Sequence, residues 1–95
     1  MKIHIESLGL PTLAGLIGKK TALELNGSTV MDLINQIVNR HGKKARTILL
    51  DQNGQLDYTI QVMVNNEGFV PRKDYATRVL KDGDAVKFLL LAGGG

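Results

Sequence analysis

One segment near the middle of the chain most constrains the fold, because its apolar residues recur with the period of an α-helix. Spacings of three and four residues place a continuous apolar stripe on one side of that helix, formed by Val30, Leu33, Ile34, Ile37 and Val38. Ser28 or Thr29 can cap its start, and Gly42 can end it in a left-handed conformation. A helix with a single apolar face needs a second surface to cover.

Segments on both sides of this helix alternate apolar and polar residues, as half-buried strands do. We expect strands over residues 2–8, 20–25, 56–65 and 85–91, with a short extended piece at 69–70. The positions expected to share an inward face are Ile3, Ile5, Ser7, Thr21, Leu23, Leu25, Tyr58, Ile60, Val62, Val64, Val86, Phe88 and Leu90.

Two further segments complete the architecture. Residues 9–18 hold Pro11 and three glycines, which predicts a loop or wide turn whose leucines touch the edge of the core. Residues 43–50 have apolar positions at helical spacing, which predicts a short second helix. The predicted fold is α+β of the β-grasp (ubiquitin-like) type, with one main helix crossing a mixed sheet of four to five strands. We place this domain at residues 1–91, followed by a flexible glycine tail at 92–95.

Composition excludes several classes of function. The chain has no cysteine, which rules out disulfides, a thiolate nucleophile and a thiolate-bound metal. His4 and His41 are far apart in the sequence, and no motif indicates a metal site or a bound cofactor. The sequence shows no nucleophile–base pair or phosphate loop, so we do not expect a stand-alone enzyme. With neither a signal peptide nor a membrane-spanning apolar run, a cytoplasmic protein without a membrane partner is expected.

The chain has a net charge of +3, and its basic residues are locally concentrated in one cluster, formed by Arg40, His41, Lys43, Lys44 and Arg46. Such a cluster can contact nucleic acid, or it can be the solvated end of a helix, where cations are favoured. Proteins that bind single strands interleave basic residues with aromatic ones, and this chain has two Phe, two Tyr and no Trp. We therefore interpret the cluster as solvated surface and do not expect a nucleic-acid partner, although a β-grasp module that binds RNA here remains an alternative.

The last four residues are Ala92 and three glycines that end at Gly95. Glycine loses the most conformational entropy on ordering, so three in succession suit a packed structure poorly. They suit a thread that enters a narrow active site, since four extended residues reach about 13 Å. A frayed terminus without function is the structural alternative.

Beside this tail, Leu89 and Leu91 share the face of the last predicted strand that points away from the helix. Apolar side chains left exposed there would form a patch for docking a partner, together with Ala92. The structural alternative is that the segment at residues 10–17 covers them.

The residues of the second half also form a set of motifs in a fixed order. They are Val62-Met63-Val64-Asn65, Val70-Pro71-Arg72, Leu80-Lys81-Asp82-Gly83-Asp84-Ala85-Val86 and Leu91-Ala92-Gly93-Gly94-Gly95, preceded by the helix start Thr29-Val30-Met31-Asp32-Leu33-Ile34. In order and spacing, these motifs resemble the ThiS/MoaD family of ubiquitin-like sulfur carrier proteins. The resemblance covers essentially the whole domain.

The resemblance implies a sulfur-carrying cosubstrate, or the small subunit of a synthase, that binds no cofactor itself. An ATP-dependent activating enzyme would adenylate the carboxylate of Gly95, and a sulfur donor would convert it to a thiocarboxylate. Gly93 and Gly94 would lead this end into the active site. The third glycine departs from the family's terminal pair, which maps onto Gly94-Gly95 here, or onto Gly93-Gly94 if processing alters the end.

Two sulfur destinations and one alternative function stay open. The Val70-Pro71-Arg72 segment followed by Asp74-Tyr75 resembles thiamine-pathway carriers, which serve thiazole synthase. The chain length favours the molybdopterin type, which serves the large subunit of molybdopterin synthase. A ubiquitin-like protein modifier, conjugated to lysines through the same glycine, would need the same tail and activation.

Overall fold

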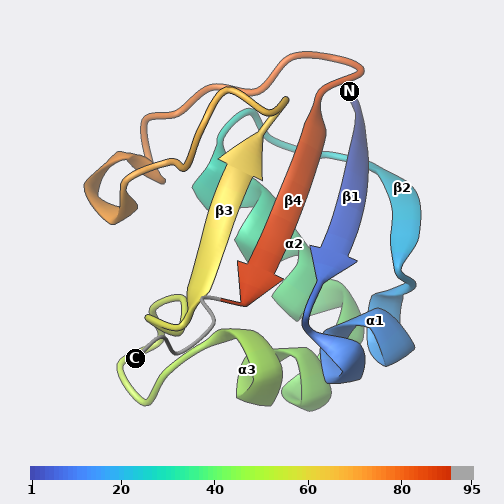
Figure 1. Ribbon diagram of the computed structural model, residues 1–95, viewed down its shortest axis with the longest axis vertical. Helices are drawn as coiled ribbons and strands as arrows, with labels where there is room; N and C mark the ends of the chain where they lie inside the picture. Colours follow the sequence, from blue (N-terminus) through green and yellow to red (C-terminus); the bar gives the residue numbers. More distant parts are fainter. Residues whose placement is uncertain (91–95) are drawn as a thin grey trace.

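The computed structural model describes residues 1–90. Within them, a four-stranded sheet packs against the main helix, and two shorter helices lie at one end of the sheet (Figure 1). The elements in chain order are β1 (Lys2–Leu8), α1 (Pro11–Ile17), β2 (Lys20–Glu24), α2 (Val30–His41), α3 (Lys43–Leu49), β3 (Ile60–Val64), the 3-10 turn η1 (Arg72–Asp74) and β4 (Ala85–Leu90). No helix in this part of the chain is long and apolar enough to cross a membrane.

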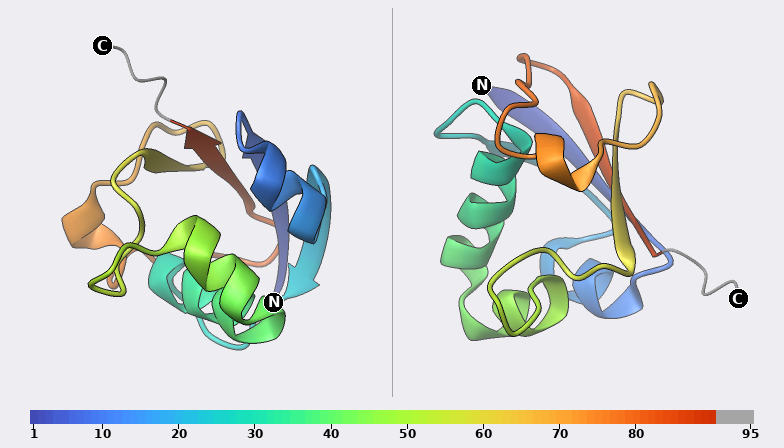
Figure 2. Two further views of the ribbon diagram at one scale, coloured as in Figure 1. Left: turned by 90° about the horizontal axis from the view of Figure 1, so that it is seen from below. Right: turned by 90° about the vertical axis from the view of Figure 1, so that its left-hand side faces the viewer.

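The sheet is mixed, with the strand order β2-β1-β4-β3. The two central strands, β1 and β4, run parallel, and each pairs antiparallel with its outer neighbour. Helix α2 lies behind the sheet in Figure 1, and the right-hand view of Figure 2 shows the helices on one side of the sheet. The predicted β-grasp fold is confirmed, with four strands in the described residues.

Helix α2 begins where the sequence predicts, because two residues cap it reciprocally. The Thr29 hydroxyl accepts a 3.1 Å hydrogen bond from the backbone N–H of Asp32. The Asp32 carboxylate in turn accepts from the backbone N–H groups of Ser28 and Thr29, at 2.9 and 3.1 Å. These bonds favour the ionised carboxylate and lower the pKa of Asp32. Gly42 ends the helix with a positive φ of 70°, as a glycine allows.

The apolar stripe of α2 forms the core with the inward positions of the strands. Helix residues Leu33 and Ile37 are at most 1% exposed, and Val62 and Phe88 of the facing strands are fully buried. Ser7 is buried on the same face, as its position in β1 predicts, and its hydroxyl has no partner in the described residues. The predicted helix over residues 43–50 is also confirmed, as α3.

The expectation of a loop over residues 9–18 was wrong, because most of this segment forms helix α1. Pro11 occupies the first turn, where its missing N–H costs nothing, and Leu13 is fully buried. Gly15 lies on the exposed side of α1, where an added Cβ would touch no atom within 4 Å. Its presence therefore weakens the helical signal in the sequence without preventing the helix.

The ends of the two C-terminal strands also differ from the prediction. Strand β3 starts only at Ile60, so Tyr58 lies before it and is 75% exposed rather than inward-facing. Leu90 has the inward parity of β4 but is 45% exposed, because it lies at the end of the strand. Residues 69–70 form no strand, and Phe69 pairs with Met63 through a single bridge.

Candidate functional site

Of the predicted site residues, the structure describes only Leu89. The others, Leu91, Ala92, Gly93, Gly94 and Gly95, lie outside the described residues. Leu89 is half-buried and points away from α2, because the alternate positions Val86 and Phe88 are the buried ones.

The end of β4 is paired on both sides within the sheet. Leu89 is paired with Leu8 of β1 on one side and with Gln61 of β3 on the other. The next residue, Leu90, is paired with Ile60. Both neighbouring strands therefore hold the end of β4, which lies in the middle of the sheet (Figure 1).

The outer face of the sheet carries two pairs of apolar side chains. Leu8 and Leu89 are neighbours at this end of β4. Met63 lies on the same face of β3, opposite Lys87, and is next to Phe69 across their bridge. Phe69 is 55% exposed, and the other three are partly buried. No helix passes in front of β3 or β4 on this face in Figure 1. We call Leu8, Met63, Phe69 and Leu89 the outer patch.

Segment 10–17 does not lie over the outer patch, contrary to the structural alternative considered for Leu89. As α1 it packs against β1 and α3 at the end of the sheet (Figure 2). An apolar patch at a protein surface commonly marks an interface. The outer patch is thus a candidate docking surface on the face of the sheet that carries Leu89.

At the other end of β4, Asn65 joins the turn that follows β3 to the turn that precedes β4. Its side-chain amide donates to the Asp84 carboxylate at 2.7 Å, and its amide oxygen accepts from the backbone N–H of Ala85 at 2.8 Å. Burial alone would raise the pKa of Asp84, but hydrogen bonds from Asn65 and the Lys81 backbone lower it below its usual value. Asn65 has a positive φ of 52°, a conformation that asparagine tolerates better than most residues.

The Val70-Pro71-Arg72 segment is structural in this chain. The Arg72 guanidinium donates hydrogen bonds to the backbone carbonyls of Leu56 and Asp57, which attaches the segment to the loop before β3. Hydrogen bonds from Thr59 lower the pKa of Asp57, and burial raises the pKa of Tyr75, whose hydroxyl has no partner in the described residues. These contacts support the fold and involve none of the outer-patch residues.

No three His, Asp or Glu side chains within residues 1–90 are placed to hold a metal ion together. The outer patch contains no group that could act as a nucleophile or a general base. Its chemistry is that of a binding surface.

A model of the ThiS family matches residues 11–95. This match includes every element from α1 to β4 and the glycine end, and it begins after β1. The chain belongs to the ThiS family. It is thus one of the small ubiquitin-like proteins of the sulfur-carrier and modifier type. A search of curated proteins returned no match.

Solved structures agree with this membership. Urm1 from Trypanosoma brucei is 28% identical over 99% of this chain and 95% of its own, with a TM-score of 0.67. The structure of the Amycolatopsis orientalis BexX/CysO complex contains a chain 25% identical, covering 98% of this chain and 99% of its own, with a TM-score of 0.69. SAMP1 from Haloferax volcanii shares the fold over the full length of both chains, with 18% identity and a TM-score of 0.75.

Sequence reasoning named Leu89 but missed the other three members of the outer patch. Leu8 and Met63 occupy outward positions of predicted strands, so their alternation was the available signal. Phe69 had no such signal, because only the folded chain brings it next to Met63.

Proposed function

We propose that this protein is a sulfur carrier whose C-terminal glycine, Gly95, is adenylated and then converted to a thiocarboxylate. The observation that carries the proposal is the match to the ThiS family through residue 95. The position of β4 supports it, since a central strand paired on both sides provides a rigid base for the glycine end. The protein would act in the cytoplasm as a cosubstrate of other enzymes.

The chemistry needs no side chain of this protein. In the first step a carboxylate oxygen of Gly95 attacks the α-phosphorus of ATP, and pyrophosphate leaves. In the second, hydrosulfide or its equivalent from a sulfur donor attacks the acyl carbon, AMP leaves, and the product is a thiocarboxylate. Because the chain has no cysteine, the sulfur donor must be a separate molecule. Glycines at positions 93 and 94 would let the end pass through a channel shaped for bare backbone.

We further propose that the outer patch docks the activating enzyme. Leu89 lies on this surface three residues before the tail, so an enzyme bound there would hold the tail near its own active site. Leu91 and Ala92 would extend the same contact. The enzyme that receives the sulfur, either the large subunit of molybdopterin synthase or thiazole synthase, would use the same end of the sheet.

The test is the intact mass of the protein after incubation with a candidate activating enzyme, ATP and a sulfur source. We expect the mass to rise by the difference between one sulfur and one oxygen, and only when ATP is present. An unchanged mass with enzymes that modify another ThiS-family carrier would contradict the proposal. Transfer of the sulfur to each of the two acceptor enzymes would then decide the pathway.

Protein modification is the second candidate function. The observation that favours it is the same glycine end, because an adenylated glycine can also acylate the amino group of a lysine. Isopeptide-linked conjugates of higher mass, seen in cells that express the tagged protein, would support it. Formation of the thiocarboxylate without such conjugates would favour the carrier.

A further inference from the structure

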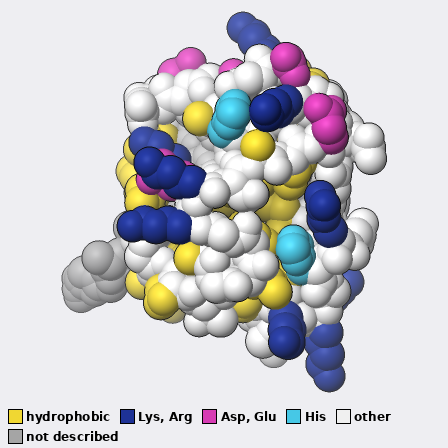
Figure 3. Space-filling view, turned by 90° about the vertical axis from the view of Figure 1, so that its right-hand side faces the viewer, with side chains coloured by type: hydrophobic (Ala, Val, Ile, Leu, Met, Phe, Trp, Pro, Cys, Tyr) yellow, Lys and Arg dark blue, Asp and Glu magenta, His cyan; other side chains and the backbone are white. Residues whose placement is uncertain are grey.

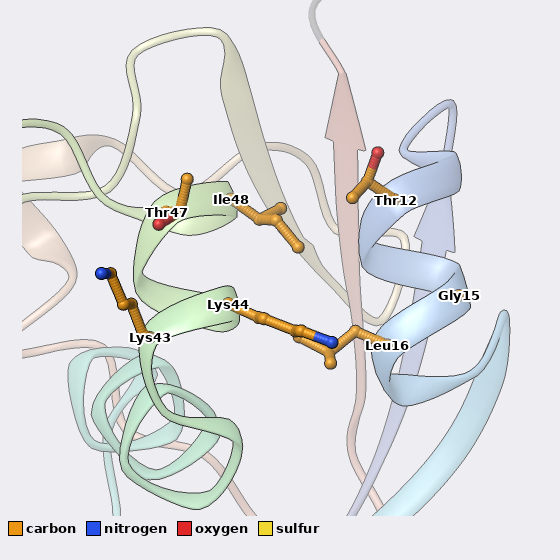
Figure 4. A pocket seen from close by; sticks show the side chains of 7 residues that line it. All are labelled: Thr12, Gly15, Leu16, Lys43, Lys44, Thr47 and Ile48. Atoms are coloured by element: carbon orange, nitrogen blue, oxygen red, sulfur yellow. The ribbon is translucent and has the colours of Figure 1, made fainter.

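A groove between α1 and α3 lies at the end of the molecule where these two helices meet. Its volume is about 750 Å3, and its walls are lined by Thr12, Gly15 and Leu16 of α1 and by Thr47 and Ile48 of α3. Figure 4 shows the side chains of Leu16 and Ile48 pointing into the space between the two helices. The lining is mostly apolar and open to solvent.

Two lysines of α3, Lys43 and Lys44, also border the groove. The side chain of Lys44 extends from α3 across the groove to Leu16, whereas Lys43 points away from it (Figure 4). Neither lysine makes an ion pair within residues 1–90. The groove therefore combines an apolar lining with a positive charge that no described carboxylate neutralises.

The two chain segments that form the groove contain basic residues but no acidic ones. Residues 9–20 and 33–50, which contain α1, α3 and most of α2, hold six Lys or Arg residues and no Asp or Glu. The rest of the chain holds the other six basic residues and all nine acidic ones. Figure 3 shows the result on one side of the molecule, where the lower end carries basic side chains and no acidic ones. The two segments that form the groove therefore carry a formal charge of +6, and the rest of the chain carries −3, from six basic and nine acidic residues.

We infer that this groove docks an acidic, amphipathic segment of a partner protein, with apolar side chains between α1 and α3 and carboxylates against Lys44. The charge distribution selects an acidic occupant, and the apolar lining selects a peptide with an apolar face over a nucleic acid. No aromatic residue lines the groove, although bases need such platforms.

The groove is a second surface, distinct from the outer patch, and its occupant need not be an enzyme of sulfur transfer. It is nevertheless close to the end of β4. Gly9, just before α1, lies so near Leu90 that an added Cβ would be 3.4 Å from the Leu90 Cβ. The inference does not rest on the proposed function, because it concerns residues that take no part in the chemistry of Gly95.

The test uses the full chain, labelled with 15N, and a synthetic helical peptide with a stripe of leucines flanked by glutamates. We expect the peptide to shift the amide resonances of Thr12, Gly15, Leu16, Thr47 and Ile48. Two peptide controls separate the contributions: serines replace the leucine stripe in one, and lysines replace the glutamates in the other. Each control should bind at least about tenfold more weakly.

Variants of the protein locate the contact. Lys44→Glu reverses the charge at the groove. Gly15→Gln places a side chain in the groove, and the fold should tolerate it, because an added Cβ at Gly15 would meet no atom within 4 Å and glycine is a poor helix former. Each should weaken binding about tenfold, whereas Lys73→Glu, the same charge change on exposed η1, should leave it unchanged. Unshifted groove resonances, or equal binding of the lysine peptide, would overturn the inference. So would a single-stranded oligouridylate that binds these residues more tightly and is insensitive to Gly15→Gln.

Discussion

The side-chain amide of Asn65 donates a 2.7 Å hydrogen bond to the carboxylate of Asp84, which joins the end of β3 to the start of β4. The same side chain accepts from Ala85, and its backbone has a positive φ. We expect Asn65→Ala to lower the free energy of unfolding by about 1–2 kcal/mol, because two hydrogen bonds are lost and alanine is strained at this φ. Asn65→Gly, which removes only the hydrogen bonds, should cost less. Equal urea midpoints for the wild type and both variants would refute this role.

The interior of α2 should be sensitive to loss of volume. Leu33→Ala or Ile37→Ala should lower the free energy of unfolding by about 2–5 kcal/mol, since both side chains are buried against the sheet. Asn35→Ala, on the exposed side of the same helix, is the matched control and should be close to neutral. Chemical denaturation measures all three, and an unchanged midpoint for Leu33→Ala would show that the register of the helix is different.

Stability should fall in acid partly through the cap of α2. Hydrogen bonds from Ser28 and Thr29 hold the pKa of Asp32 below its usual value near 3.8, so the folded state binds the proton less readily than the unfolded state. The contribution is therefore complete above the usual value and is lost as the pH falls through the lower pKa of the folded state. In Asp32→Asn the difference in urea midpoint between neutral pH and about pH 3 should be smaller than in the wild type. An identical difference in both proteins would contradict this assignment.

Docking of the activating enzyme should depend on the outer patch. Leu89→Asp, and Leu91→Asp beyond the described residues, should raise the dissociation constant for that enzyme at least about tenfold by placing a charge in an apolar contact. Val79→Asp is the control, because Val79 is 55% exposed but lies in the connection before β4. Calorimetric titration gives the constants, and thermal unfolding shows whether each variant is folded. A Leu89→Asp protein that is folded and binds normally would exclude this surface.

The glycine end should be essential for activation and dispensable for stability. Deletion of Gly94 and Gly95 should abolish adenylation and change the free energy of unfolding by less than about 0.5 kcal/mol, since these residues have no side chain to bury. Gly94→Val should slow the reaction, because a β-branched side chain restricts the backbone and would obstruct a narrow channel. Pyrophosphate release measures both.

A chain extended by one residue beyond Gly95 is the control for this prediction. It displaces the reactive carboxylate and adds little bulk. Sulfur acquisition by the extended chain at the normal rate, without prior trimming, would disprove the C-terminal mechanism.

The sequence alone determined those helices and strands that have a clear local periodicity of apolar residues. Helix α2 could be predicted to within a residue because its five apolar positions and its cap at Thr29 are local signals. The strands followed from alternation, which is why Val62 and Phe88 were correctly expected in the core. Helix α1 was missed because it has only seven residues, about two turns, and contains Gly15, so its helicity depends on the burial of Leu13 in the folded protein.

Only the tertiary structure decided which surfaces these elements form. Leu8 and Leu89 become neighbours through the parallel pairing of β1 with β4, and Phe69 joins them through Met63, which no local pattern encodes. The same holds for the groove, which Leu16 of α1 and Ile48 of α3 line from two helices that are separate in the sequence. Periodicity specifies which side of an element is apolar, because it depends on the backbone geometry of that element alone. Which apolar sides meet, and which remain open for partners, depends on the packing of all the elements together.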